Sequence, residues 1–298
     1  MTRYSLKQLN ITLCLTAVFG LHLIGLAGYL MHLRSGFMLD PVLARPYGLF
    51  SVYWYGVVLL VSIGIGFWAV ATQSAKSDVL PSFSVWRYAI SIVLSGIVGA
   101  RLFDVVFLSP IAISQGITGT WDYFDNPALL FDFNWGGLNI WGALFGSVLM
   151  LYWVCWRAAI PRILIFFKAT SGFLIGLSLV QWGHFLNQEL YGVPWNRLGS
   201  ILIESIHRLP LYAGADRFVP LFLLAAVWYL AGGMWLFFGR RWQRTLVDQL
   251  DGILFGLIWF AVGRLFLELV TPNSLFNWLP ASMLLAIIFI TVFIRKNI

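Results

Sequence analysis

The sequence predicts an all-α, polytopic membrane protein with eight transmembrane helices. Of its 298 residues, 60% are hydrophobic and only 10% are charged, and the mean hydropathy is +0.85. A soluble domain of this length could not cover so much apolar surface with so few charges. The 15 tryptophans and 11 tyrosines fit a chain that meets two lipid–water interfaces. Composition therefore indicates one membrane domain.

Eight apolar segments are long enough to cross a hydrocarbon core, which takes about 20 helical residues. They are residues 11–31, 49–71, 86–107, 136–156, 163–185, 218–239, 250–270 and 277–294. The first follows Arg3 and Lys7, as a signal sequence would. Its apolar run is long for a signal peptide and no small-x-small cleavage site follows, so we expect a retained helix.

The distribution of basic residues predicts the orientation. With the N-terminus inside, most Lys and Arg residues fall in cytoplasmic segments, and both termini are expected in the cytoplasm. The two long connections, 108–135 and 186–217, then lie outside, so polar chemistry is expected to open toward the outer face. The net charge of +7 is scattered over short loops, which argues against nucleic-acid binding. Cys14 and Cys155 lie far apart in apolar segments and indicate no disulfide framework.

Two arginines remain inside predicted spans, where a charge costs about 2.5–3.5 kcal/mol on insertion scales. Arg101 can pair with Asp104 at i, i+3, and Arg264 with Glu268 at i, i+4. One interpretation is two structural ion pairs. The other is that both arginines face a shared cavity and bind an anion, since a guanidinium fork suits a phosphate. In a membrane, such a phosphate would belong to a phospholipid head group.

Further polar residues occur at similar depth. The stretch QWGHFLNQELYG supplies Gln181, His184, Asn187 and Glu189, and the second span supplies Tyr55. A single membrane histidine such as His184 is more often a hydrogen-bonded structural group than a general base, and Asn187 and Glu189 close behind it add modest support for a base. The glycine-rich stretches NWGGLNIWGALFG and SGIVGARLF indicate close helix packing.

Several of these elements, in order along the chain, resemble the bacterial prolipoprotein diacylglyceryl transferases. They are DPVLARPYGLFSVYWYG, GARLFDVVF, WGGLNIWGALFG, QWGHFLNQELYG and GRLFLE. The resemblance covers about residues 40–296. That family has seven spans, so residues 1–35 are expected to form an added helix and residues 36–298 a transferase-like domain. It also implies a multi-pass protein of the bacterial inner membrane.

The resemblance implies transfer of a diacylglyceryl group from phosphatidylglycerol to a preprolipoprotein cysteine, without cofactor or metal. The expected catalytic residues are His184, Glu189, Arg264 and Glu268, and the expected lipid- or phosphate-binding residues are Arg101, Tyr55, Asn187 and Gln181. The arginines would stabilise the leaving phosphate, and a base would deprotonate the thiol.

The sequence also departs from the family pattern. Trp141 occupies the place of the histidine proposed as base, and Gln181 and His184 occupy the places of the signature's arginine and first asparagine. His184 is therefore expected to supply the base. The alternative is a non-catalytic paralogue that acts as a lipid-binding scaffold or as a subunit of a membrane complex. A small transporter is a weaker alternative, because no internal repeat is evident.

Overall fold

The computed structural model describes residues 3–45, 51–76, 82–108, 113, 116–131 and 139–271, with a few single positions between 282 and 292. Within them, 7 helices are long and apolar enough to cross a membrane. These helices match the first seven predicted spans and confirm a polytopic all-α membrane protein. The eighth predicted span, 277–294, lies outside the described residues apart from the single positions.

The long helices occur in the expected order and are joined by short elements. The helices are α1 (Arg3–Ser35), α2 (Trp54–Lys76), α3 (Ser82–Phe107), α6 (Ile140–Arg157), α7 (Arg162–Leu186), α8 (Leu221–Phe238) and α9 (Leu246–Val270). The short elements are β1 (Val42–Ala44), β2 (Val52–Tyr53), α5 (Asp122–Asp125), η2 (Pro127–Phe131), β3 (Ile201–Leu202), η3 (Ser205–His207), η4 (Pro210–Tyr212), β4 (Arg217–Phe218) and η5 (Arg240–Gln243).

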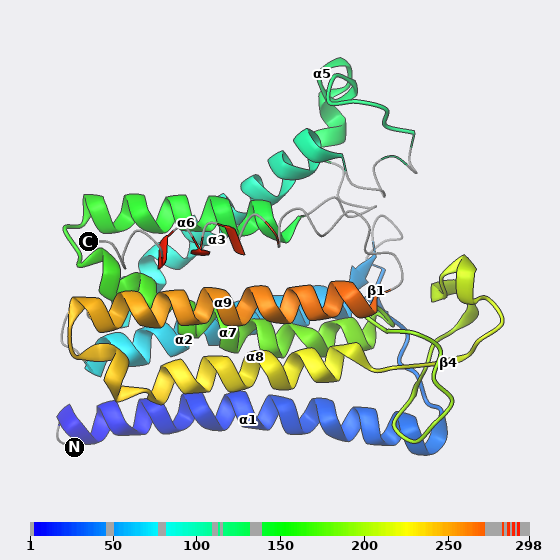
Figure 1. The fold of residues 1–298 in the computed structure, drawn as a ribbon, viewed down its shortest axis with the longest axis horizontal. Coiled ribbons are helices and arrows are strands. Elements are labelled where there is room, and N and C mark those ends of the chain that lie inside the picture. The colour runs from blue at the N-terminus through cyan, green and yellow to red at the C-terminus, as the bar shows by residue number, and fades with distance from the viewer. Residues whose placement is uncertain are drawn as a thin grey trace. The chain divides into compact units, whose positions relative to one another are not determined.

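The chain forms two compact units. Unit 1 comprises residues 1–78 and 166–298, and unit 2 comprises residues 79–165. In unit 1, α1, α8 and α9 run side by side, and β4 lies beyond one end of them (Figure 1). The helix α1 belongs to this unit, and the predicted boundary at residue 35 stays a prediction.

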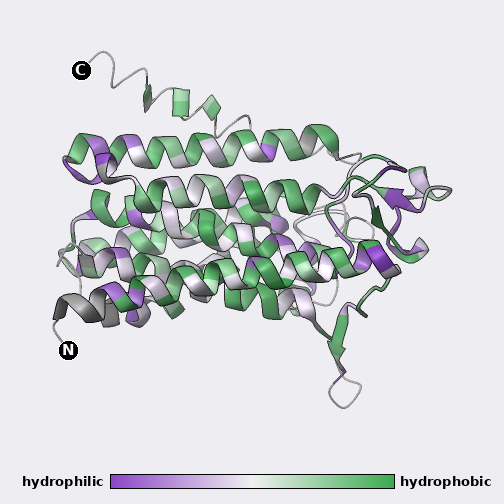
Figure 2. Ribbon diagram, turned by 90° about the horizontal axis from the view of Figure 1, so that it is seen from below, coloured by the Kyte–Doolittle hydropathy of each residue, from purple (hydrophilic) through white to green (hydrophobic). Residues whose placement is uncertain are grey.

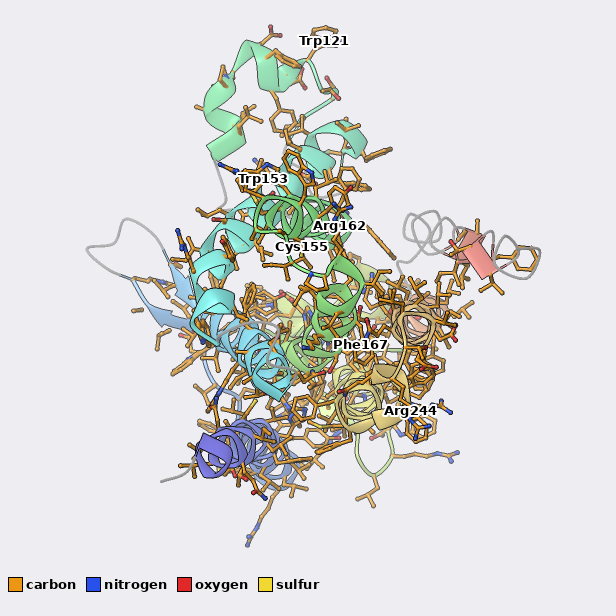
Figure 3. All side chains as sticks on the ribbon, turned by 90° about the vertical axis from the view of Figure 1, so that its left-hand side faces the viewer. Trp121, Trp153, Cys155, Arg162, Phe167 and Arg244 are labelled. Atoms are coloured by element: carbon orange, nitrogen blue, oxygen red, sulfur yellow. The ribbon has the colours of Figure 1, made fainter. Side chains whose placement is uncertain are left out.

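The helices of unit 1 are mostly apolar along their length, and strongly hydrophilic residues occur chiefly toward their ends (Figure 2). A few polar side chains, among them Lys168 and Ser171, are nevertheless buried. Phe167 of α7 is fully buried within the bundle, whereas the exposed Arg244 stands at its edge (Figure 3). Phe167 packs where the side chain of Gly252 would otherwise be, since a Cβ there would lie 2.6 Å from the ring. The Phe167 ring therefore packs directly on the α9 backbone at Gly252.

Glycines bring α2 and α7 into backbone contact. A Cβ built on Gly66 would lie 2.9 Å from the carbonyl oxygen of Gly172, and one on Gly176 would lie 2.9 Å from the carbonyl oxygen of Ser62. Real Cβ atoms do not approach a carbonyl so closely, so glycine is required at these crossings. This contact fixes the spacing of the two helices that carry Tyr55 and His184.

Two tryptophans join α8 to α9. The indole N–H of Trp228 donates to the Trp259 carbonyl oxygen at 2.9 Å, and that of Trp259 donates to the Trp228 carbonyl oxygen at 2.8 Å. Their rings stack, with centroids 4.2 Å apart and planes 15° apart. Gly232 and Gly263 leave room for the two indoles. We call this reciprocal pair the tryptophan staple.

In unit 2, α3 and α6 cross on the glycine-rich stretches that the sequence predicted for packing. A Cβ on Gly99 would collide with the Gly142 carbonyl oxygen, and one on Gly146 would collide with the Ser95 carbonyl oxygen. The Ser95 hydroxyl donates to the Gly146 carbonyl oxygen at 3.0 Å across the same crossing. The predicted packing role of these glycines is confirmed.

Residues 187–220, between α7 and α8, fold into a small structure that we call the cap. Its strands β3 and β4 pair antiparallel, with Ile201 opposite Phe218 and Leu202 opposite Arg217. The chain entering the cap also pairs with the chain leaving it, because the Gly192 amide donates to the Val219 carbonyl oxygen at 2.9 Å. The start of the cap, just after α7, is therefore held firmly against the start of α8.

Candidate functional site

The helix α7 ends in a turn that brings His184 and Glu189 together. The Glu189 amide donates to the His184 carbonyl oxygen at 2.8 Å, and the Gln188 amide donates to the Phe185 carbonyl oxygen at 3.1 Å. Gln188 has a left-handed backbone with φ 55°. These bonds and this conformation define a Schellman turn, in which the residue after the left-handed one folds back on the last helical turn. The spacing of five residues is thus what juxtaposes the two side chains.

The side chains then complete a hydrogen-bonded group. His184 Nδ1 lies 3.1 Å from Glu189 Oε2, and Asn187 Nδ2 donates to Glu189 Oε1 at 3.2 Å. With Nδ1 donating its proton to the carboxylate, the other ring nitrogen, Nε2, is the one able to accept a proton. A base oriented by a carboxylate that is itself held by a third group is the arrangement used to activate nucleophiles.

The Glu189 carboxyl is stabilised in its charged form. Burial alone would favour the neutral acid, but hydrogen bonds from His184 and Asn187 and the charges of His184 and His207 outweigh it, and the pKa of Glu189 is lowered. The side chain is nevertheless 52% exposed, so solvent screens part of this attraction. Glu189 therefore stays ionised at neutral pH and can hold an imidazolium ion.

Tyr55 forms the wall of the site opposite His184. Its ring lies against Gly183, where a Cβ would come 2.9 Å from the ring, and its centroid is 5.1 Å from that of His184. Both rings are partly buried. The structure thus brings together four of the predicted site residues, His184, Asn187, Glu189 and Tyr55.

Gln181 lies one helical turn before His184 and is 3% exposed. Its Nε2 donates to the Leu177 carbonyl oxygen at 2.9 Å, within its own helix. Its Oε1 is buried without a hydrogen-bond partner in the described part of the chain, and the same holds for Asn187 Oδ1. Both atoms are acceptors, so this side of the site is suited to a ligand that carries hydrogen-bond donors.

Arg101 belongs to unit 2, where the protein's own groups occupy its guanidinium. It forms the predicted i, i+3 ion pair with Asp104 at 3.6 Å. It also donates to the carbonyl oxygens of Leu130, at 3.1 Å, and of Leu129. Its head lies 5.7 Å from the centre of the Tyr123 ring. Arg101 thereby ties the end of α3 to the segment around η2, and its role in binding phosphate stays a prediction.

Arg264 is half-buried in α9 and follows Gly263, which packs against Trp228 of the tryptophan staple. The side chain of Glu268 lies outside the described residues, so the Arg264–Glu268 pair stays a prediction. Trp141, the residue in place of the family histidine, stands at the start of α6 in unit 2, where its amide donates to the side chain of Asn139 at 2.9 Å. Arg101 and Arg264 belong to different units, and their convergence on one head group also stays a prediction.

Sequence reasoning missed Gln188. This residue is 1% exposed, takes the left-handed position that glycine usually fills, and accepts the Glu204 amide on its Oε1 at 2.8 Å. It therefore fixes the turn that presents Glu189 to His184. Its place between Asn187 and Glu189, just past a helix end, is the signal that could have identified it.

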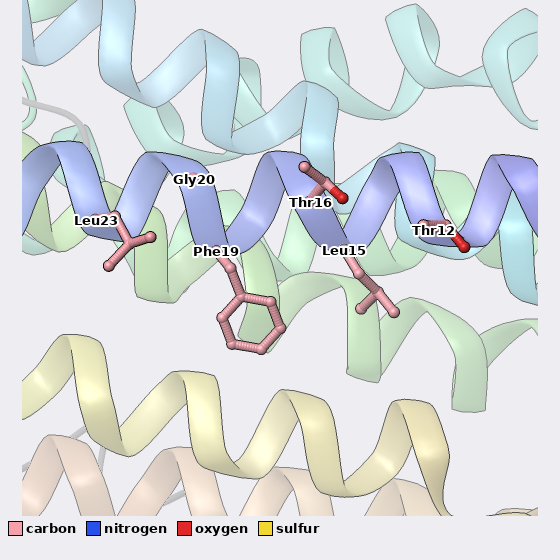
Figure 4. A pocket seen from close by; sticks show the side chains of 6 residues that line it. All are labelled: Thr12, Leu15, Thr16, Phe19, Gly20 and Leu23. Carbon is pink, nitrogen blue, oxygen red and sulfur yellow. The ribbon is translucent and has the colours of Figure 1, made fainter.

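Within the described residues, no metal site offers an alternative to this group. No cluster of three or more His, Cys, Asp or Glu side chains there could hold a metal ion. A hollow on the outer face of α1 is lined by apolar and hydroxyl side chains alone, as Figure 4 shows. These are Thr12, Leu15, Thr16, Phe19, Gly20 and Leu23. The site therefore rests on the end of α7.

The family described as prolipoprotein diacylglyceryl transferase matches residues 41–295. A phosphatidylglycerol–prolipoprotein diacylglyceryl transferase of Halalkalibacterium halodurans is 30% identical over 226 residues, covering 74% of this chain and 72% of the relative. The protein of that name from Streptococcus sanguinis is 29% identical over 260 residues, covering 86% and 93%. We conclude that this chain belongs to the prolipoprotein diacylglyceryl transferase family.

Proposed function

We propose that this protein transfers a diacylglyceryl group from phosphatidylglycerol to the cysteine of a prolipoprotein. Family membership and the names of relatives that match most of the chain support this substrate pair. The observation that carries it is the group of His184, Asn187 and Glu189, because thiol transfer needs a base and this group holds one in a defined orientation.

In the proposed reaction, His184 Nε2 takes the proton of the cysteine thiol. The thiolate sulfur attacks the carbon of the diacylglycerol moiety that is bonded to the phosphate oxygen, forming a C–S bond as this C–O bond breaks. Glycerol phosphate leaves with the electron pair, and its charge is stabilised by Arg264. Glu189 stabilises the imidazolium that forms, and Asn187 holds Glu189 in place. Tyr55 and Gln181 line the head-group side, and Glu268 would orient Arg264.

We place the protein in the bacterial inner membrane with both termini in the cytoplasm. The excess of Lys and Arg in the segments on that side supports this orientation. The cap and the site would then face the outer leaflet, where a secreted acceptor emerges from the membrane.

A second candidate function is a non-catalytic paralogue that binds a lipid or joins a membrane complex. Gln181 and Trp141 favour it, because each stands where the family pattern has an arginine or a histidine. The wall formed by Gln181 carries an unpaired acceptor instead of a cation. Such a protein would bind phosphatidylglycerol without transferring its diacylglyceryl group.

One assay distinguishes the two candidate functions. The purified full chain is incubated in phosphatidylglycerol vesicles with a lipobox peptide, and the mass of the peptide reports transfer. We expect a gain equal to one diacylglyceryl group, abolished in His184→Ala and unchanged in His22→Ala, a histidine of α1. Absence of transfer by correctly folded protein, with lipid still bound, would leave the paralogue as the function.

A further inference from the structure

The C-terminal turn of α1 is bonded directly to the cap. The Tyr29 hydroxyl donates to the Gly199 carbonyl oxygen at 2.5 Å. His32 is 3% exposed and uses both ring nitrogens: Nδ1 lies 3.1 Å from the Phe37 carbonyl oxygen, and Nε2 accepts the Leu202 amide at 3.0 Å. Only the neutral imidazole with its proton on Nδ1 satisfies both bonds.

The same face of α1 packs on the α7 residues that flank His184. A Cβ on Gly25 would collide with the Trp182 ring, so that ring lies directly on the α1 backbone. The Phe185 ring meets His32 edge-on, with centroids 5.9 Å apart, and meets Tyr29 at 6.0 Å. The helix therefore supports the last turn of α7 from behind, on the side away from Tyr55.

The cap also hydrogen-bonds to the turn at the end of α7. Two residues after Leu202, the Glu204 amide donates to Gln188 Oε1 at 2.8 Å. Gln188 is the left-handed residue of the Schellman turn that presents Glu189. A continuous path thus runs from the His32 ring through β3 to the turn, and each step in it is a hydrogen bond to the main chain or a covalent link.

We infer that His32 is a positioning residue, which holds the cap so that the turn bearing Glu189 keeps its place against His184. The family match begins at residue 41, so this role falls on a helix outside the matched region. The inference concerns how rigidly the cap and the turn are held. It does not depend on whether the proposed transfer reaction is correct.

The bond to Leu202 depends on the protonation state of His32. A second proton would sit on Nε2 and face the Leu202 N–H, so an accepted hydrogen bond would become a contact between two donors. Arg217 of β4 is the charged side chain that acts on the ring, Phe185 faces it from α7, and the exposed Arg34 follows it on α1. Acidification is therefore expected to release the cap from α1.

The test is hydrogen exchange of the full chain in nanodiscs of phosphatidylethanolamine and phosphatidylglycerol, read by mass spectrometry on peptides covering 199–204 and 186–190. At pH 7.5, His32→Phe keeps the ring volume but loses both bonds, and exchange should rise about tenfold in both peptides. His32→Gln keeps an uncharged acceptor within reach of Leu202 and should stay near the wild-type rate. His22→Phe is the matched control, because His22 Nδ1 lies 2.9 Å from the Val18 carbonyl oxygen of its own helix and a phenyl ring keeps the edge-on contact with Trp182. It should change neither peptide.

The pH series supplies the second readout. After correction for intrinsic exchange, wild-type exchange in both peptides should rise between pH 7.5 and pH 5, whereas His32→Gln should stay flat. Faster exchange at 199–204 with no change at 186–190 would overturn the inference, since His32 would then stabilise the cap without positioning the turn. An equal acid response in wild type and His32→Gln would overturn the role of His32 protonation, and the comparison holds even if His32→Phe does not fold.

Discussion

Replacing Glu189 by glutamine tests the central geometry of the site. The side chain keeps its size and a hydrogen-bond acceptor, but it loses the charge that holds His184 and stabilises the imidazolium. A hydrogen bond to a charged group contributes about 1.5–3 kcal/mol. Because the Glu189 side chain is 52% exposed, we take the lower end of that range. At 1.36 kcal/mol per factor of ten, kcat should fall about tenfold.

The assay is peptide lipidation in vesicles, with Glu204→Gln as control because its exposed carboxyl lies in the same cap. His184→Ala should fall further, by about 10²–10⁴, the range of a lost general base. Because the pKa of Glu189 is lowered, its carboxylate contributes stability above the ordinary pKa of about 4.3 and loses it only as pH falls through the folded value. Glu189 therefore stays ionised from pH 6 to pH 8, and its own titration should not alter the loss in that range. A Glu189→Gln enzyme with wild-type kcat would refute the orienting role of the carboxylate.

Three further predictions concern the scaffold. Gly99→Ala should lower the free energy of unfolding by about 1–3 kcal/mol, because its methyl group would collide with α6. Gly20→Ala is the control and should be neutral, since a Cβ there meets nothing within 4 Å. Equal melting temperatures of the two variants would contradict the packing. Trp228→Phe should cost about 0.6–1.7 kcal/mol by losing one bond of the staple, and Trp259→Phe a similar amount; no change in either would show that the staple does not stabilise the α8–α9 pair. Arg101→Lys should speed proteolysis between 116 and 131, because one ammonium group cannot span two carbonyls and a carboxylate; unchanged cleavage would refute the tethering.

The helices and much of the site could be predicted from the sequence because their determinants are local. Apolar runs set the spans, and the i, i+3 spacing sets the Arg101–Asp104 pair. The His184–Glu189 contact is also local, since a helix terminus folds residue i+5 back on residue i. Residues that lie close in sequence and on one turn can be placed together without knowing the tertiary fold.

The role of His32 could not be predicted in the same way. Its partner Leu202 lies 170 residues away, and nothing near His32 in sequence marks it as bonded. His32 is one polar residue in an apolar helix, as His22 is, and both rings pack against α7. The hydrogen bond from Leu202 of the cap is what distinguishes His32. The prediction that Arg101 and Arg264 share a cavity also depends on tertiary structure. The ion pair of Arg101 with Asp104 does not, because it is set by the spacing along one helix.

The glycine crossing of α2 and α7 has an evolutionary consequence. Because Gly66 and Gly172 set the interval between the two helices by main-chain contact, that interval does not depend on which side chains line the site. Residues 181 and 184 can then be exchanged for others with the scaffold unchanged. Substitutions at the end of α7 therefore need not alter the interval between α2 and α7.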